Sequence, residues 1–214
     1  MTDRRRLSGD TRCLLRQARA AIDAGIDILQ IRERDLEAAE LHELVKEIVA
    51  MARGSQCRVV VNDRLDVAIA SGAAGVHLRG DSMPPGPVRR VAPRGLLIGR
   101  SVHGVEEAVA VAADVDYLIA GTVWRTESKE AGRQYPLLGP EGLAAIAAKV
   151  RVPVVAIGGV TLDRISAVRA AGAAGVAAIG LFMGDARGGE CRAIPLQERV
   201  AAIRLRFDTS RRAS

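Results

Sequence analysis

Gln30, Arg32 and Arg34 stand at every second position of the stretch DILQIRERD, residues 27–35. Because strand side chains alternate between two faces, an extended segment would place all three on one face. Two guanidinium groups on one face could hold a phosphate or diphosphate through charge-assisted, bidentate hydrogen bonds. The alternative is a strand that ends at Ile31, followed by a solvated loop whose arginines pair with neighbouring carboxylates.

Asn62 and Asp63 directly follow the apolar stretch RVVV. Oxygen-bearing side chains at the end of a strand suit Mg²⁺, which proteins hold through one or two carboxylates together with the phosphates of a substrate. Asn and Asp also cap helices, and the segment RLDVAIASG that follows is a predicted helix. Both roles can coexist on adjacent residues, so the sequence leaves both open.

Glycines follow two later apolar stretches, in AIGGV and in AAIGLF. Gly158 and Gly159 in the first, with Ile179 and Gly180 in the second, would let backbone N–H groups approach phosphate oxygens. The alternative is glycine that serves only close helix packing. Their position at the exits of the last two strands favours phosphate binding.

The segment GTVWRTESKEAGRQYPLLG is the longest connection between a predicted strand and a predicted helix. Long loops inside compact domains often bind ligands or cover a site. Thr126, Ser128 and Lys129 in this segment could donate hydroxyl and ammonium hydrogens to an anion. An ordinary polar surface loop is the alternative.

Apolar strands and Ala-rich helical segments alternate along nearly the whole chain, which indicates a parallel sheet covered by helices. We predict seven strands, near 26–31, 58–62, 75–78, 96–99, 116–120, 153–157 and 175–180. A (β/α)8 TIM barrel has eight strands and carries its active site at their carboxyl ends, where the polar residues above fall. The first strand is then missing or truncated at the N-terminus. An open doubly wound sheet is less well supported, since no GxGxxG follows a first strand.

Composition narrows the classes of function. The 214 residues, 49% hydrophobic, suit one barrel domain over residues 1–207 with a basic tail over 208–214. Aromatic residues are only 2%, which argues against base-stacking nucleic-acid surfaces despite the net charge of +6. No apolar run reaches membrane-spanning length, and the three cysteines show no pairing framework, so we expect free thiols in a cytoplasmic protein. The spacing of three dispersed histidines argues against a zinc site, and only His103 is expected near the site.

These stretches, taken in order, resemble the thiamine phosphate synthase and TenI superfamily of (β/α)8 barrels. The likeness covers nearly the whole chain, through TDRRRL, QIRERDL, VNDRLDVA, GVHL, IGRSVHGVEEA, DYLIAGTVWRTESK, PVVAIGGV and GVAAIG. In the synthase, a hydroxymethylpyrimidine diphosphate is joined to a thiazole phosphate, and pyrophosphate leaves with help from Mg²⁺. The resemblance therefore implies a transferase of thiamine biosynthesis whose partners are these two small molecules, with homo-oligomerisation left open.

The resemblance also implies roles for individual residues. It implies catalytic roles for Arg32, Arg34, Ser101 and Lys129, and Mg²⁺ ligation by Asp63 and Asp81. It implies substrate contacts for Gln30, Asn62, Thr122, Thr126, Ser128, Gly158, Gly159, Ile179 and Gly180. Among these, Gln30 would contact the pyrimidine, and the two glycine-bearing strand ends would hold the thiazole phosphate.

The sequence departs from the synthase pattern at two positions and from the TenI-type tautomerase pattern at one. Arg34 stands where the synthase usually has Lys, and Ser82 stands where the second Mg²⁺ ligand is expected, with Asp81 one residue earlier. Thr122 stands where TenI-type thiazole tautomerases have a proton-transferring His. The alternatives to a synthase are thus a TenI-type tautomerase or regulatory relative, and a non-catalytic binder of thiazole phosphate or thiamine phosphate. In the family the first barrel strand directly precedes TDR, so we expect either a start upstream of Met1 or an unfilled first position.

Overall fold

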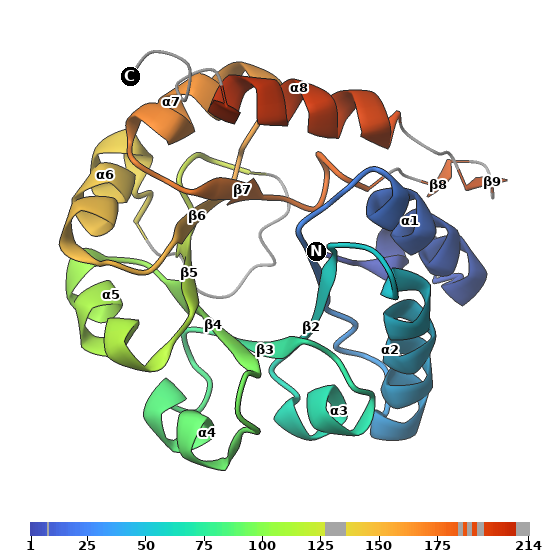
Figure 1. The fold of residues 1–214 in the computed structure, drawn as a ribbon. Helices are drawn as coiled ribbons and strands as arrows, with labels where there is room; N and C mark the ends of the chain where they lie inside the picture. Colours follow the sequence, from blue (N-terminus) through green and yellow to red (C-terminus); the bar gives the residue numbers. More distant parts are fainter. Residues whose placement is uncertain (8, 127–135, 184–185, 188–189, 192–194, 209–214) are drawn as a thin grey trace. The chain divides into compact units, whose positions relative to one another are not determined.

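The computed structural model describes residues 1–7, 9–126, 136–183, 186–187, 190–191 and 195–208 (Figure 1). Seven strands form one parallel sheet, in the order β1-β2-β3-β4-β5-β6-β7. They are β1 (Ile28–Ile31), β2 (Arg58–Asn62), β3 (Gly75–Leu78), β4 (Leu97–Val102), β5 (Tyr117–Gly121), β6 (Val154–Ile157) and β7 (Gly175–Ala177). An α/β fold of the (β/α)8 class is thereby confirmed, with seven strands in this sheet.

Helices separate the strands along the chain. They are α1 (Thr11–Asp23), α2 (Ala38–Ala52), α3 (Leu65–Ala70), α4 (Pro85–Val91), α5 (Val105–Val111), α6 (Gly139–Lys149), α7 (Ile165–Ala170) and α8 (Leu196–Asp208). Two-residue strands β8 (Ala186–Arg187) and β9 (Glu190–Cys191) pair antiparallel, and the sequence did not predict them. Of the expected tail over 208–214, Asp208 ends α8 and the remainder lies outside the described residues. Among the described helices, none has the length and apolar character that crossing a membrane would need.

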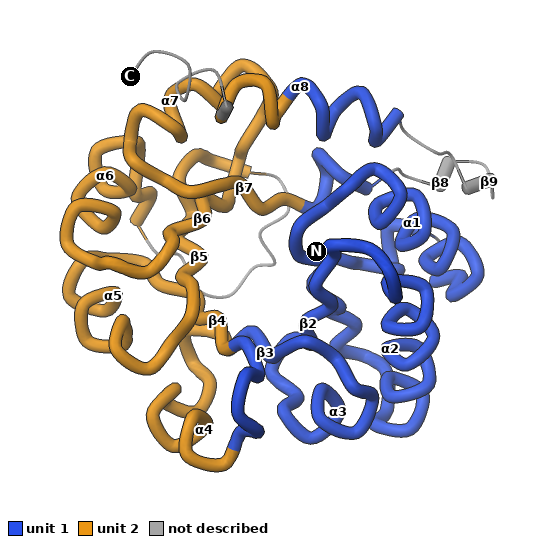
Figure 2. The backbone as a smooth tube through the Cα atoms, in the orientation of Figure 1, with its two compact units in different colours: residues 1–77, 92–97, 179–202 blue, residues 78–91, 98–178, 203–214 orange. Residues whose placement is uncertain are grey.

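The chain divides into two compact units (Figure 2). Unit 1 comprises residues 1–77, 92–97 and 179–202, and unit 2 comprises residues 78–91, 98–178 and 203–214. Within unit 1, helices α1, α2 and α3 lie on one side of the strands; within unit 2, helices α4 to α7 do so (Figures 1 and 2). Each unit contributes its own set of strand ends, and the candidate residues are described unit by unit below.

Burial follows the sequence pattern closely. Val59, Val60 and Val61 of β2 are 3%, 0% and 0% exposed, so the strand is covered on both faces, as expected where helices pack on a parallel sheet. Helix α2 instead buries a stripe formed by Leu41, Leu44, Val45 and Ile48 and leaves its glutamates in solvent. The strands therefore read as continuous apolar runs, while the helices read as one apolar face with a period of about 3.6 residues.

No strand precedes α1 in the described part of the chain, as the sequence predicted. A 3-10 helix forms at Arg4–Leu7 instead. The first residues lie beside β1, because the Thr2 N–H donates to the Gln30 carbonyl at 2.9 Å and the Thr2 hydroxyl accepts from the Arg32 N–H at 2.9 Å. The N-terminal segment thus extends along the strand that carries the first candidate residues.

The expectation of free thiols holds for Cys57 and is wrong for Cys13. Cys57 is buried and unbonded, and burial raises the pKa of its thiol to about 11. Cys13, buried on α1, is disulfide-bonded. Spacing could not reveal this bond, because the geometry that a disulfide requires is set by the folded chain rather than by intervals in the sequence.

Candidate functional site

Gln30 and Asn62 form a buried amide pair in unit 1. Gln30 lies on β1 and is 4% exposed, and Asn62 ends β2 and is 8% exposed. Gln30 pairs in register with Val60, so Asn62 lies two residues further toward the carboxyl end of the sheet. The Gln30 Nε2 donates to Asn62 Oδ1 at 3.0 Å. The pair holds two polar side chains in fixed orientations at the strand ends, which is what recognition of a polar ring needs.

The expectation that Gln30, Arg32 and Arg34 share a strand face is wrong, because β1 ends at Ile31. Arg32 is half-buried just past the strand, while Arg34 is exposed in the following turn. The alternative was a solvated loop whose arginines pair with neighbouring carboxylates. It is wrong in one respect, because Glu33 of this loop is buried rather than solvated.

Arg4 is the residue that binds the two carboxylates of this loop. Its N–H donates to Glu33 Oε2 at 3.0 Å, and its guanidinium donates to Asp35 at 2.9 Å. Glu33 is 4% exposed, and burial raises the pKa of its carboxyl more than the hydrogen bonds from Thr2 and Arg4 lower it. The loop after β1 is therefore fastened to the N-terminal segment.

Asp63 has the left-handed backbone conformation, with φ of 63°. Its N–H donates to the carbonyl of the buried His77 at 2.9 Å, and Arg64 N–H donates to the Asn62 carbonyl at 2.9 Å. Helix α3 begins after Arg64 without a side-chain capping bond, so the predicted capping role of Asn62 or Asp63 is wrong. Aspartate is among the few non-glycine residues that adopt this conformation with some frequency, and such residues cluster at functional sites.

Ile179 and Gly180 lie in a turn after β7. The N–H groups of Phe182 and Met183 donate to the Ile179 carbonyl at 3.0 and 2.8 Å. The Arg6 guanidinium lies beside this turn, since a Cβ built on Gly180 would be 3.4 Å from Arg6 Nη1. A cationic side chain that the sequence did not single out is therefore close to one predicted phosphate-binding segment.

Gly158 and Gly159 of unit 2 connect β6 to the next helix in left-handed conformations, with φ of +98° and +61°. The loop after β5 packs tightly against them. A Cβ on Gly158 would meet Thr122 Cγ2 at 2.3 Å, and a Cβ on Gly159 would meet the Arg125 carbonyl oxygen at 2.6 Å. Backbone geometry and packing of two loops, rather than helix packing, thus require glycine at both positions.

Ser101, Thr122 and Thr126 lie on or just beyond the ends of β4 and β5 in unit 2. Ser101 is half-buried on β4 opposite Ile119, and Thr122 follows β5 directly. His103 lies beyond β4, and its Nδ1 hydrogen-bonds the Gly121 carbonyl. Because a carbonyl only accepts, this nitrogen carries the proton. The expectation that His103 lies among the candidate residues is consistent with this position.

Asp81 is engaged by a neighbouring guanidinium: its Oδ2 accepts from Arg79 Nη2 at 2.6 Å, and its side chain is 42% exposed. Arg100 of β4 organises the same loop. It is 7% exposed and donates to the carbonyls of Gly80 at 2.8 Å and Met83 at 2.9 Å. A buried arginine therefore fixes the backbone around Asp81.

A family model described as thiamine monophosphate synthase matches residues 2–182 of the chain. A thiamine-phosphate synthase of Methanospirillum hungatei is 42% identical over 164 residues, covering 76% of this chain and 78% of that protein. That of Methanoculleus marisnigri is 41% identical over 191 residues, covering 87% and 88%. The chain belongs to the thiamine monophosphate synthase family. Among solved structures, a thiamine phosphate pyrophosphorylase of Pyrococcus furiosus superposes with a TM-score of 0.78 at 31% identity, covering 94% of this chain and 93% of that one.

Asp63 is the carboxylate that best fits the Mg²⁺ expected in this family. No three His, Cys, Asp or Glu side chains of the described residues gather as a metal site. Asp63, half-buried with its backbone fixed by His77, fits a site in which one protein carboxylate acts together with substrate phosphates. Asp81 of unit 2 is engaged in its exposed ion pair with Arg79, a kind of contact worth about 0–1 kcal/mol.

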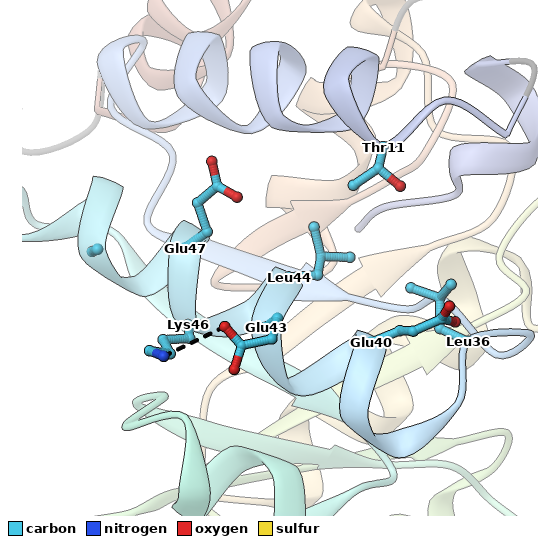
Figure 3. Close-up of a pocket in the computed structure, with 8 residues that line it drawn as sticks. Thr11, Leu36, Glu40, Glu43, Leu44, Lys46 and Glu47 are labelled. Carbon is cyan, nitrogen blue, oxygen red and sulfur yellow. Dashed lines mark hydrogen bonds and ion pairs between the residues drawn. The ribbon is translucent and has the colours of Figure 1, made fainter.

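Ser128 and Lys129, two further residues that the family resemblance implicates, lie outside the described residues. A cavity of unit 1 lies elsewhere, between α1 and α2 (Figure 3). It is lined by Thr11, Leu36, Glu40, Glu43, Leu44, Lys46, Glu47 and Ala50. Its glutamates outnumber its single lysine, so it does not suit the phosphorylated substrates of thiamine monophosphate synthases.

Proposed function

We propose that this chain is a thiamine-phosphate synthase, which joins hydroxymethylpyrimidine diphosphate to a thiazole phosphate and releases pyrophosphate. The observation that carries the proposal is the family match over residues 2–182, with relatives of that name 41–42% identical over most of the chain. The bond between the pyrimidine methylene carbon and the diphosphate oxygen breaks, and its electron pair leaves with pyrophosphate. The thiazole nitrogen then donates its pair to the methylene carbon.

The strand ends of unit 1 supply groups suited to the pyrimidine diphosphate. The Gln30 amide, held by Asn62, would hydrogen-bond the pyrimidine. Arg32 and Arg34 would bind the diphosphate, with Arg34 reaching from its exposed turn. Lys129 would add charge at the leaving group. Such positive groups lower the barrier because charge accumulates on the departing pyrophosphate in the transition state.

In unit 2, the thiazole phosphate would be held by backbone N–H groups at Gly158 and Gly159, the first pair of glycine-bearing strand-end residues. The left-handed conformations of these two glycines set the directions of their N–H groups. Thr126 and Ser128 would add hydroxyl donors, Thr122 would line the thiazole, and Ser101 would lie beside the pyrimidine. These assignments extend the family resemblance to the residues at each strand end.

Mg²⁺ would bind Asp63 together with diphosphate oxygens and neutralise charge on the leaving group. Asp63→Asn should therefore raise the Mg²⁺ concentration needed for half-maximal rate by about tenfold or more. Asp81→Asn should change it less than about threefold, because Asp81 is occupied by Arg79. If instead the two variants behave alike, Asp81 is a full ligand and the exchange from Arg79 occurs on binding. Calorimetric titration of Mg²⁺ with pyrophosphate present gives a readout that does not depend on turnover.

The deciding experiment is a coupling assay. Purified protein is mixed with pyrimidine diphosphate, thiazole phosphate and Mg²⁺, and thiamine phosphate and pyrophosphate are measured with and without chelator. Equal amounts of both products, lost on chelation, are expected. Lys129→Ala should abolish turnover, whereas the matched control Lys149→Ala, at the exposed end of α6, should not change it. No product from protein that still binds thiazole phosphate would refute the synthase and favour the non-catalytic binder.

Thiazole tautomerisation is a second candidate, favoured by one observation. Thr122 does not titrate near neutrality, but His103 hydrogen-bonds the carbonyl of the residue before it, Gly121. A histidine is a competent proton-transfer group at neutral pH. If the chain isomerises a thiazole carboxylate phosphate, His103→Gln should abolish that reaction. Tautomerisation that survives this substitution would exclude His103 as its base.

A further inference from the structure

Arg164 connects the two loops of unit 2 that carry Thr122 and the paired glycines. It ends the 3-10 helix Leu162–Arg164, and its Nη1 donates to the Gly159 carbonyl at 2.6 Å. Its guanidinium carbon lies 5.1 Å from the ring centroid of Trp124, within the range of a cation–π contact. Backbone bonds join the same loops, since the Trp124 N–H donates to the Gly158 carbonyl at 3.0 Å.

The hydrogen bond from Arg164 sets the direction of one backbone donor. The Gly159 carbonyl and the Val160 N–H belong to one planar trans peptide, so they point in opposite directions. Holding the carbonyl on Arg164 therefore fixes where the Val160 N–H points. A glycine alone would leave this peptide free to rotate among many conformations. The positive charge also polarises the peptide and makes its N–H a stronger donor.

Arg164 also places a positive charge beside this turn. Among the described residues, its guanidinium contacts Gly159 and Trp124 and pairs with no carboxylate. The other guanidinium pairs described above, such as Arg4 with Asp35 and Arg79 with Asp81, are neutralised locally. A half-buried cation without a described counter-charge attracts an anion to the adjoining backbone.

We propose that Arg164 is a positioning residue for the phosphate of the thiazole substrate. It fixes the Gly159–Val160 peptide, with the Trp124 ring packed against its guanidinium, and supplies a positive charge beside the glycine turn. This inference rests on the proposed function, because it assumes that a phosphorylated thiazole binds at Gly158 and Gly159. Its consequence is that recognition of the phosphate, rather than of the thiazole ring or the pyrimidine diphosphate, depends on Arg164.

Comparing a thiazole with and without its phosphate separates the contribution of the phosphate to binding from that of the thiazole ring. Dissociation constants of thiazole phosphate and of the unphosphorylated thiazole alcohol are measured by calorimetry for the native chain and for Arg164→Ala. Loss of a charge-assisted hydrogen bond should raise the Kd of thiazole phosphate about tenfold or more and leave that of the alcohol unchanged. Arg164→Lys keeps the charge but not the planar guanidinium, so its Kd for thiazole phosphate should lie between those of the native chain and Arg164→Ala. Arg151→Ala, an exposed arginine just before β6, is the matched control.

Trp124 supplies a second readout, because it is the only tryptophan among the 214 residues. Its emission should change when thiazole phosphate binds the native chain, and change less in Arg164→Lys. In turnover, Arg164→Lys should raise KM for thiazole phosphate and leave KM for the pyrimidine diphosphate unchanged. This split separates a positioning role from a general loss of stability, which would lower the apparent kcat through a smaller folded fraction and would not raise one KM selectively.

The two proposals fail in different ways. If the native chain does not bind thiazole phosphate, the phosphate site of the proposed function is wrong and the inference falls with it. If the native chain binds thiazole phosphate and makes thiamine phosphate, but Arg164→Lys and Arg164→Ala bind it with unchanged Kd, the proposed function stands and Arg164 has no part in phosphate recognition. Equal weakening of the phosphate and the alcohol would likewise overturn the inference.

Discussion

Gly159→Ala should destabilise the chain and weaken phosphate binding together, because the new methyl group has no space. The left-handed backbone at Gly159, with φ of +61°, costs a residue with a Cβ about 1–2 kcal/mol. The methyl would also lie 2.6 Å from the Arg125 carbonyl oxygen, and 2.8 and 2.9 Å from the Trp124 Cβ and carbonyl oxygen. Two of these atoms are backbone and cannot rotate away, so overpacking adds about 1–3 kcal/mol.

Gly54→Ala is the matched control, since Gly54 has φ of +79° and no atom lies within 4 Å of the place that its new methyl group would take. Gly54→Ala should lose only the stability that the strained backbone costs, which lowers Tm by about 2–8 °C in a chain of this size. Gly159→Ala should lose about 2–12 °C beyond that. Thermal unfolding followed by circular dichroism compares the two, and steady-state kinetics should show a raised KM for thiazole phosphate only in Gly159→Ala. Equal losses of Tm with unchanged KM would show that the two loops separate freely, and would refute the packing argument.

Three further perturbations test contacts elsewhere. Gln30→Leu leaves the buried Asn62 Oδ1 without its donor and should lower the free energy of unfolding by about 1–3 kcal/mol. Adding Asn62→Leu should recover part of this loss. Simple additivity in a double-mutant cycle of unfolding free energies would contradict the pairing. Arg100→Met removes the donor to the carbonyls of Gly80, Ser82 and Met83, so limited proteolysis should cut near Asp81 faster than in the native chain. An unchanged rate would refute the loop-fixing role. Burial raises the pKa of Glu33, so the native chain should lose stability as pH rises from the ordinary glutamate range through the raised value. When Tm is measured against pH, Glu33→Gln should lack this loss. Parallel curves for the two proteins would exclude Glu33 as the source of the loss.

The arrangement of strands could be predicted because its signals are local. Strands β1, β3 and β7 are short apolar runs that follow a glycine turn, and β2 and β3 lie at the predicted residues. Strand β4 extends to Val102, beyond the predicted end at residue 99. The prediction was too short because the polar residues Arg100 and Ser101 resemble a loop in the sequence. Arg100 is nevertheless buried, since loop carbonyls satisfy its guanidinium. Such partners come from another segment and leave no mark in the strand itself.

The contacts that shape the candidate residues were less predictable, for the same reason. Alternation suggested that Arg34 faces the same way as Gln30, but the strand stops at Ile31, and the buried residue of the loop is Glu33. Its burial depends on Arg4, 29 residues earlier in the chain. The disulfide at Cys13 and the position of Arg6 beside Gly180 likewise depend on the folded chain rather than on local sequence. Residue type and position could identify which strand ends are polar, but not which side chains they contact.

Gly158 and Gly159 show why residue type alone does not establish function. Their positive φ angles and the close approach of Thr122 and Trp124 would require glycine even in a chain that binds no phosphate. The glycines therefore explain the shape of the turn, while Arg164 adds a cation that is held against its backbone without a described carboxylate partner. Burying part of an uncompensated charge is unfavourable on its own. A bound phosphate would offset that cost, which is why the charge at Arg164, more than the glycines beside it, is the feature that binding measurements should address.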